Sequence, residues 1–86
     1  MEDYPVSDVM EVLDGETIYK SDGWWKAVLL CDNKENQKEP TIRFYLWRKK
    51  GRSWKTSHKY EIKSKNNWER EKVAVERMVG VLPHSS

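Results

Sequence analysis

The sequence has little cysteine, no long apolar run and no clustered glycine. Cys31 is the only cysteine, which excludes a disulfide scaffold. The longest apolar run covers residues 27–31, whereas a membrane-spanning helix needs about 20 residues. The four glycines lie singly, so the chain has no glycine-rich phosphate loop. Residues 1–3 are acidic where a secretory signal would be basic, and we therefore expect an intracellular protein, cytoplasmic or nucleoid-associated.

Side chains suited to catalysis or metal binding are also scarce. His58 and His84 are the only histidines, and His58 with Cys31 would give too few ligands for zinc, which takes three or four. Neither Ser53 nor Ser57 stands in a nucleophile-elbow motif. We therefore expect a binding protein rather than an enzyme, with no metal and no cofactor.

Charge and aromatic surface are what this chain has in excess. Charged residues make up 35% of it and aromatic residues 12%, five of them tryptophan, and disordered chains lack such aromatic surface. The net charge of +2 conceals a segregation, because residues 1–16 have six acidic and no basic residues while residues 43–65 have nine basic residues against Glu61. A local basic field attracts polyanions. A lysine-rich edge strand that blocks aggregation would show the same charge pattern.

The hydrophobic pattern predicts four strands. Asp-Gly pairs at 14–15 and 22–23 are typical of turns, and residues 16–20 and 24–31 are predicted to form a β-hairpin around the second pair. Residues 32–40 are polar and predict a loop. Two more strands are predicted, separated by a tight turn at 50–53, and they cover residues 41–49 and 54–63.

A single helix is predicted after the strands. Asn66 has the capping-box spacing to Glu69 that begins a helix, and Pro83 ends it. Its apolar stripe would consist of Trp68, Val75, Met78, Val79 and Leu82. We therefore expect an α+β fold, a four-stranded antiparallel sheet followed by one C-terminal helix packed on one face. Residues 1–8 would be an acidic N-terminal arm, 9–82 a single β-β-β-β-α domain and 83–86 a short tail.

The functional prediction depends on side-chain alternation along the third strand. Because successive side chains of a strand point to opposite faces, Ile42, Phe44 and Leu46 are expected to share the face beneath the helix. The opposite face would be open and would carry alternating cations and rings. The nucleic-acid-binding residues predicted on this open face and in the adjoining turn are Trp24, Lys26, Arg43, Tyr45, Trp47, Lys49, Lys50, Arg52, Lys55, Lys59 and Lys63.

Rings interleaved with cations suit single-stranded nucleic acid. Unpaired bases stack on aromatic side chains for about 1–3 kcal/mol each, while Lys and Arg contact the phosphates. Aromatic cross-strand pairs and cation–π contacts also stabilise ordinary sheets, and a second alternative is that this face is covered by the arm or by another subunit. We expect non-catalytic binding of single-stranded DNA or RNA, with a protein–protein interaction module on the same aromatic face as the alternative. Binding of double-stranded RNA or of ribosomes is a third possibility, which would not need an outward Trp47.

From Thr41 onward the sequence resembles the core of the Whirly and positive-cofactor-four superfamily of single-stranded-DNA-binding proteins. The resemblance is carried by the alternating IRFYLW, the charged turn KKGRS, the basic strand KTSHKYEIK and the helix KNNWEREKVAVERM. Archaeal thermophile-type single-stranded-DNA-binding proteins are similar in the same way. The resemblance implies a homodimer joined partly through its helices, with DNA bound across the sheet. We also hypothesise that the acidic residues 1–16 mimic nucleic acid and shield the binding face when no ligand is present.

Overall fold

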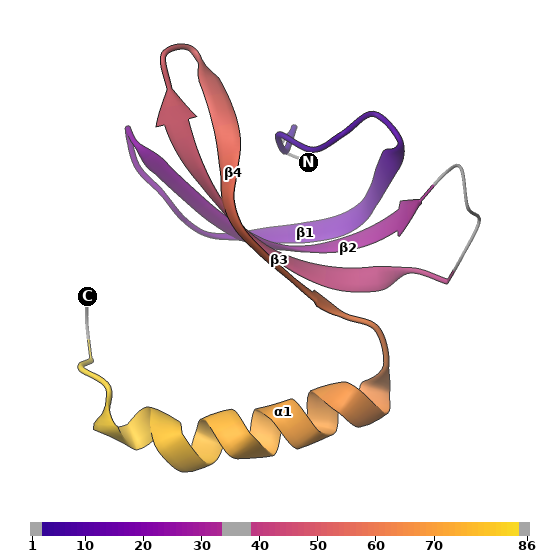
Figure 1. Cartoon of the computed structure of the whole chain (residues 1–86), viewed down its shortest axis with the longest axis vertical. Helices are drawn as coiled ribbons and strands as arrows, with labels where there is room; N and C mark the ends of the chain where they lie inside the picture. The colour runs from indigo at the N-terminus through magenta and orange to yellow at the C-terminus, as the bar shows by residue number, and fades with distance from the viewer. Residues whose placement is uncertain (1–2, 34–38, 85–86) are drawn as a thin grey trace.

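A computed structural model describes residues 3–33 and 39–84 of the chain, so that the centre of the predicted 32–40 loop lies outside the described residues. One antiparallel sheet has the strand order β1-β2-β3-β4 (Figure 1). Its strands are β1 Met10–Lys20, β2 Trp24–Asn33, β3 Thr41–Lys50 and β4 Ser53–Ile62. Helix α1, Lys65–Met78, continues into a short 3-10 turn, Val79–Val81. The predicted fold class, a four-stranded antiparallel sheet followed by one C-terminal helix that contacts the sheet, is confirmed.

Two Asp-Gly pairs behave differently. At residues 22–23 the chain turns as predicted, and the Ser21 backbone N–H donates to the Trp24 carbonyl at 2.7 Å. The turn predicted at residues 14–15 is wrong, because β1 continues through it and Gly15 pairs with Leu29. A register shift between Val12 and Asp14 takes up the extra residue, so the strand bends instead of reversing.

The β3–β4 turn and the helix start follow local rules. Gly51 has φ +62°, a left-handed conformation that glycine adopts without a steric penalty. The helix begins earlier than predicted, because Ser64 is the N-cap and its side chain accepts a hydrogen bond from the Asn67 backbone N–H at 3.2 Å. The prediction of Asn66 as the cap is therefore wrong. Ser64 has the extended backbone that an N-cap requires, with φ −149° and ψ 156°.

The register between β2 and β3 decides which side chains share a face. Trp25 lies opposite Trp47 and Ala27 opposite Tyr45, and directly opposed residues point to the same side. This side, which we call the arm face, holds the buried core. Its buried members are Trp25, Ala27, Leu29, Cys31, Tyr45 and Trp47. The described part of the N-terminal arm crosses the arm face (Figure 1), with Tyr4 and Val6 packed against the core.

The opposite side, which we call the helix face, is less well covered. It carries Val28, Leu30, Ile42, Phe44, Leu46, Tyr60 and Ile62. Helix α1 lies on this side (Figure 1), where the Tyr60 hydroxyl donates to the Glu71 carboxylate. None of the residues 65–78 of α1 is buried. None of the helices in residues 3–33 and 39–84 is long and apolar enough to cross a membrane.

The structure corrects the predicted location of the core. Ile42, Phe44 and Leu46 share a face on the helix side, as predicted, but all three stay partly exposed. The core lies on the arm face, where the arm covers the rings. The expectation that the arm face would be open is therefore wrong.

Candidate nucleic-acid interface

Five rings from the arm and three strands meet on the arm face, and we call them the aromatic cluster. They are Tyr4, Trp25, Tyr45, Trp47 and Trp54. Tyr45 and Trp47 stack with centroids 5.0 Å apart and planes inclined at 8°. Trp25 lies 5.1 Å from Trp47 and 5.6 Å from Trp54. Such ring pairs contribute about 0.5–1.5 kcal/mol each beyond their buried area, so the cluster is also a structural core.

The centre of the cluster is fully covered. Trp47 is 0% exposed and Tyr45 6%, so the prediction that these two rings lie open to solvent is wrong. The physical reason is that Tyr4 and Val6 of the arm pack over this part of the sheet. The Trp47 Nε1–H is buried and has no hydrogen-bond partner among the described residues. A buried donor without an acceptor costs about 1–3 kcal/mol.

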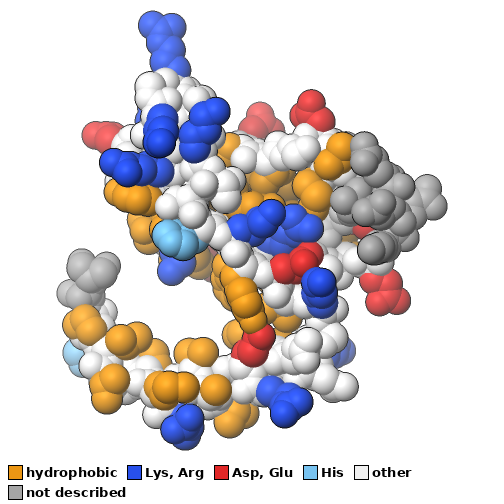
Figure 2. All heavy atoms as spheres, in the orientation of Figure 1, with side chains coloured by type: hydrophobic (Ala, Val, Ile, Leu, Met, Phe, Trp, Pro, Cys, Tyr) orange, Lys and Arg blue, Asp and Glu red, His pale blue; other side chains and the backbone are white. Residues whose placement is uncertain are grey.

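Basic side chains surround the cluster. The Lys20 Nζ lies 3.8 Å from the centroid of the Trp25 ring, and the Lys49 Nζ lies 5.6 Å from that of Trp54. Lys59 is exposed and pairs across the sheet with Tyr45. Exposed Lys50 and Arg52 extend this basic rim onto the β3–β4 hairpin tip, where Figure 2 shows Lys and Arg side chains gathered. The arm face therefore combines flat rings with a positive border.

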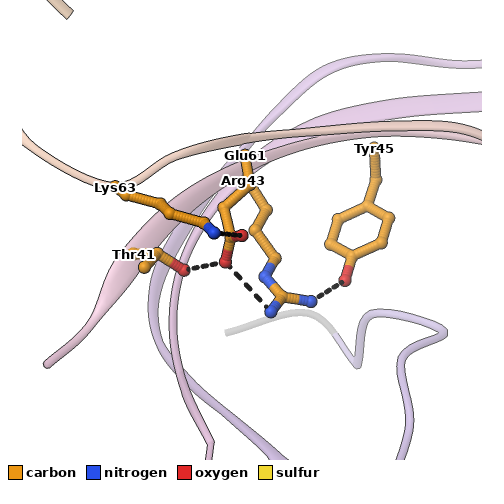
Figure 3. Close-up of polar contacts among 5 residues, drawn as sticks. All are labelled: Thr41, Arg43, Tyr45, Glu61 and Lys63. Carbon is orange, nitrogen blue, oxygen red and sulfur yellow. Dashed lines mark hydrogen bonds and ion pairs between the residues drawn. The ribbon is translucent and has the colours of Figure 1, made fainter. Parts of the chain in front are cut away.

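Arg43 belongs to a polar network at the other end of this face (Figure 3). Its Nη2 lies 3.1 Å from Glu61 Oε2, and its Nη1 donates to the Tyr45 hydroxyl at 3.2 Å. Glu61 Oε2 also accepts from the Thr41 hydroxyl at 2.7 Å, and Lys63 Nζ lies 4.0 Å from Glu61 Oε1. The Thr41 hydrogen bond and the charges of Arg43 and Lys63 hold the pKa of Glu61 below its usual value. Because Glu61 neutralises Arg43, this guanidinium holds the Tyr45 ring in place instead of facing solvent as a free cation.

Three of the predicted site residues lie on the helix face. Trp24 pairs with Arg48, whose guanidinium carbon lies 5.6 Å from the Trp24 ring centroid, and Lys55 pairs with the same arginine. Lys26 pairs with Leu46. The prediction that Trp24, Lys26 and Lys55 share one face with Tyr45 and Trp47 is therefore wrong. Whether they contact nucleic acid stays a prediction.

Four residues of the interface escape the sequence prediction. Trp25, Lys20 and Trp54 join it through the β2–β3, β1–β2 and β3–β4 registers respectively, which alternation within one strand does not reveal. Tyr4 joins from the arm. Its signal in the sequence is the apolar trio Tyr4-Pro5-Val6 inside an otherwise acidic segment, a pattern typical of a segment that packs on a sheet.

Comparisons with protein-family models, curated proteins and solved structures find no match to this chain. The resemblance to the Whirly and positive-cofactor-four superfamily stays a prediction. Within residues 3–33 and 39–84, no group of three or more His, Cys, Asp or Glu side chains is placed to hold a metal ion.

Proposed function

We propose that this chain binds single-stranded nucleic acid on its arm face, without catalysis. The observation that carries the proposal is the position of two ammonium groups over the aromatic cluster, Lys20 over Trp25 and Lys49 over Trp54. Unpaired bases stack on such rings, and lysines beside them contact the phosphates that join the bases. Duplex DNA offers no free base faces and has no need of the rings.

Base stacking and phosphate binding are assigned to two different sets of residues on the arm face. The rings proposed for stacking are Trp25, Tyr45, Trp47 and Trp54. Only Trp54 is partly exposed while the arm is docked, so stacking on the other three requires release of the arm. The phosphate contacts belong to the cations of the rim, which are Lys20, Lys49, Lys50, Arg52 and Lys59. Arg43 supports the site indirectly, because it is paired with Glu61 and donates to the Tyr45 hydroxyl.

A titration with oligo(dT) at low salt tests this proposal. Stacking should quench tryptophan emission, and the affinity should fall steeply as salt is added. If all five rim cations contact phosphates, the slope of log K against log salt should be about −3.5, since each contact to a single strand contributes about −0.7. Unchanged emission and no binding at low salt would contradict the proposal, and would favour the protein–protein interaction module.

Two lysines on β4 provide a matched pair of variants. Lys59 lies on the arm face opposite Tyr45, and Lys55 lies on the helix face opposite Arg48. Lys59→Gln should weaken oligo(dT) binding about fivefold at 0.1 M salt, the effect of one lost phosphate contact. Lys55→Gln removes the same charge from the same strand and should change the affinity by less than about twofold. An equal loss in the two variants would place the nucleic acid elsewhere on the molecule.

We further propose that two copies of the chain associate through α1. Three side chains of the predicted stripe support this, because Val75, Met78 and Val79 are all about half exposed although they are apolar. Figure 2 shows hydrophobic side chains running along this helix. The helix face also keeps Phe44 and Leu46 partly exposed. Apolar surface left open on two elements of one chain is typical of an interface.

A further inference from the structure

Tyr4 of the arm is inserted as a flat ring into the aromatic cluster. Its ring centroid lies 5.5 Å from that of Trp25 and 6.1 Å from that of Trp47, with planes inclined at 34° and 26°. The pair with Trp47 is stacked and the pair with Trp25 is tilted, and both separations lie in the range of favourable aromatic contacts. The ring of Tyr4 therefore makes the same kind of contact that the proposed function assigns to an unpaired base.

Gly15 provides the room for this ring. A Cβ at this position would come within 2.9 Å of Tyr4 Cε2 and 2.7 Å of Leu29 Cδ2. The glycines at 23, 51 and 80 are different, because a Cβ there would meet nothing within 4 Å. The seat of Tyr4 is thus a ring-sized slot between Trp25, Trp47 and the backbone of β1.

A second observation marks the slot as suited to another occupant. The indole Nε1–H of Trp47 is fully buried in this cluster and unpaired, and Tyr4 does not supply it with an acceptor. Bases have carbonyl and ring-nitrogen acceptors on their edges. Tyr4 has a single side-chain acceptor, its hydroxyl oxygen, and this oxygen does not pair with the Trp47 N–H. A base in this seat would retain the ring contact and bring acceptors at several other positions of its ring.

The N-terminal arm can leave the sheet without losing its own backbone hydrogen bonds. In the described chain its backbone hydrogen bonds are local, from the Val6 N–H to the Tyr4 carbonyl at 2.8 Å and from the Met10 N–H to the Ser7 carbonyl at 3.0 Å. Release of the arm would leave these bonds intact. Asp3 and Asp8 flank the docked segment in the sequence, and both are exposed, so the arm that crosses the basic arm face carries negative charge.

We propose that Tyr4 occupies the seat of a nucleobase, so that the arm is a tethered competitor that must leave before an unpaired base stacks against Trp25 and Trp47. This rests on the proposed function. A short tether keeps Tyr4 at an effective concentration on the order of millimolar. The association constant measured for nucleic acid is therefore the intrinsic constant multiplied by the fraction of chains whose seat is open. The arm thereby weakens the measured affinity by a constant factor.

The test compares four chains, the unmodified protein and three variants, by the fluorescence anisotropy of a labelled oligo(dT) of about 16 nucleotides. Tyr4→Ala should bind roughly tenfold more tightly than the unmodified protein, because the two stacking contacts of the competitor are lost. Tyr4→Phe keeps the ring and should bind within about twofold of the unmodified protein. The double variant Asp3→Asn and Asp8→Asn keeps the ring and loses two charges. Its gain in affinity for oligo(dT) should be smaller than that of Tyr4→Ala.

The outcomes separate this inference from the proposed function. Equal, measurable affinity of Tyr4→Ala and the unmodified protein would overturn the role of Tyr4 and leave the proposed function standing. No binding by any of the chains would overturn both, while binding by Tyr4→Ala alone would support both strongly.

A second measurement needs no variant, and it tests whether the arm is displaced even if Tyr4→Ala does not fold. Nuclear Overhauser contacts between the Tyr4 ring and the rings of Trp25 and Trp47 in the unmodified protein should disappear when oligo(dT) is added, because the arm leaves the sheet. Persistence of these contacts in the complex would overturn the inference.

Discussion

Trp25 and Trp47 lie directly opposite each other on β2 and β3, with ring centroids 5.1 Å apart and planes inclined at 59°. The register that places these two rings opposite each other also brings Tyr45 and Ala27 to the same side. The arm face is therefore at once the core of the fold and the proposed binding surface, and mutations there affect stability as well as binding.

Trp47 and Trp24 should differ sharply in their effect on stability. Trp47 is fully buried, so Trp47→Ala should lower the free energy of unfolding by about 3–5 kcal/mol. Trp24 is 39% exposed on the helix face, and Trp24→Ala should cost less than about 1 kcal/mol. Urea denaturation followed by circular dichroism measures both values. If Trp47→Ala does not fold, Trp47→Phe gives the comparison, and equal losses at the two positions would contradict the assigned core.

Glu61 should make stability depend on pH in the acid range. Its pKa is lowered in the folded chain by the Thr41 hydrogen bond and by the charges of Arg43 and Lys63. The stabilisation is therefore present above the ordinary glutamate pKa of 4.5 and is lost as the pH falls through the lower folded value. The urea midpoint of the unmodified protein should fall more steeply below pH 4.5 than that of Glu61→Gln. Parallel pH profiles would show that the network contributes nothing.

The exposed helix stripe predicts a dimer. Light scattering should give a mass of twice the chain mass of 10.3 kDa. Val75→Glu places a charge in the stripe and should lower this mass toward that of one chain while the helix content is retained. Val81→Glu is the control, because Val81 is 89% exposed beyond α1 and lies outside the stripe. A single-chain mass for the unmodified protein would contradict the association proposed through α1.

Much of the fold is predictable from local pattern. The bounds of β3 and β4 agree with the predicted strands within one residue, because turn residues and β-branched or aromatic runs act locally. Alternation along β3 is also predicted correctly, since it follows from strand geometry alone. The helix is predicted, although Ser64 rather than Asn66 caps it.

The faces of the sheet are less predictable, for a physical reason. Alternation shows which residues of one strand point to the same face. Only the register between β2 and β3 shows that Trp25, and not Trp24, shares a face with Trp47. The polar sequence between β2 and β3, residues 34–40, has no diagnostic turn signal from which this register could be predicted. The cover over the rings depends on Tyr4, which reaches them from the start of the chain. A contact between residues so far apart in the sequence produces no periodic pattern from which it could be predicted.

The indole N–H signals of the five tryptophans test the central claim most directly. In a two-dimensional NMR spectrum, adding oligo(dT) should shift the signals of Trp25, Trp47 and Trp54, which belong to the aromatic cluster. Trp24 on the helix face and Trp68 on α1 serve as internal controls and should stay in place. Shifts confined to Trp24 and Trp68, or no shift in any signal, would contradict nucleic-acid binding on the arm face.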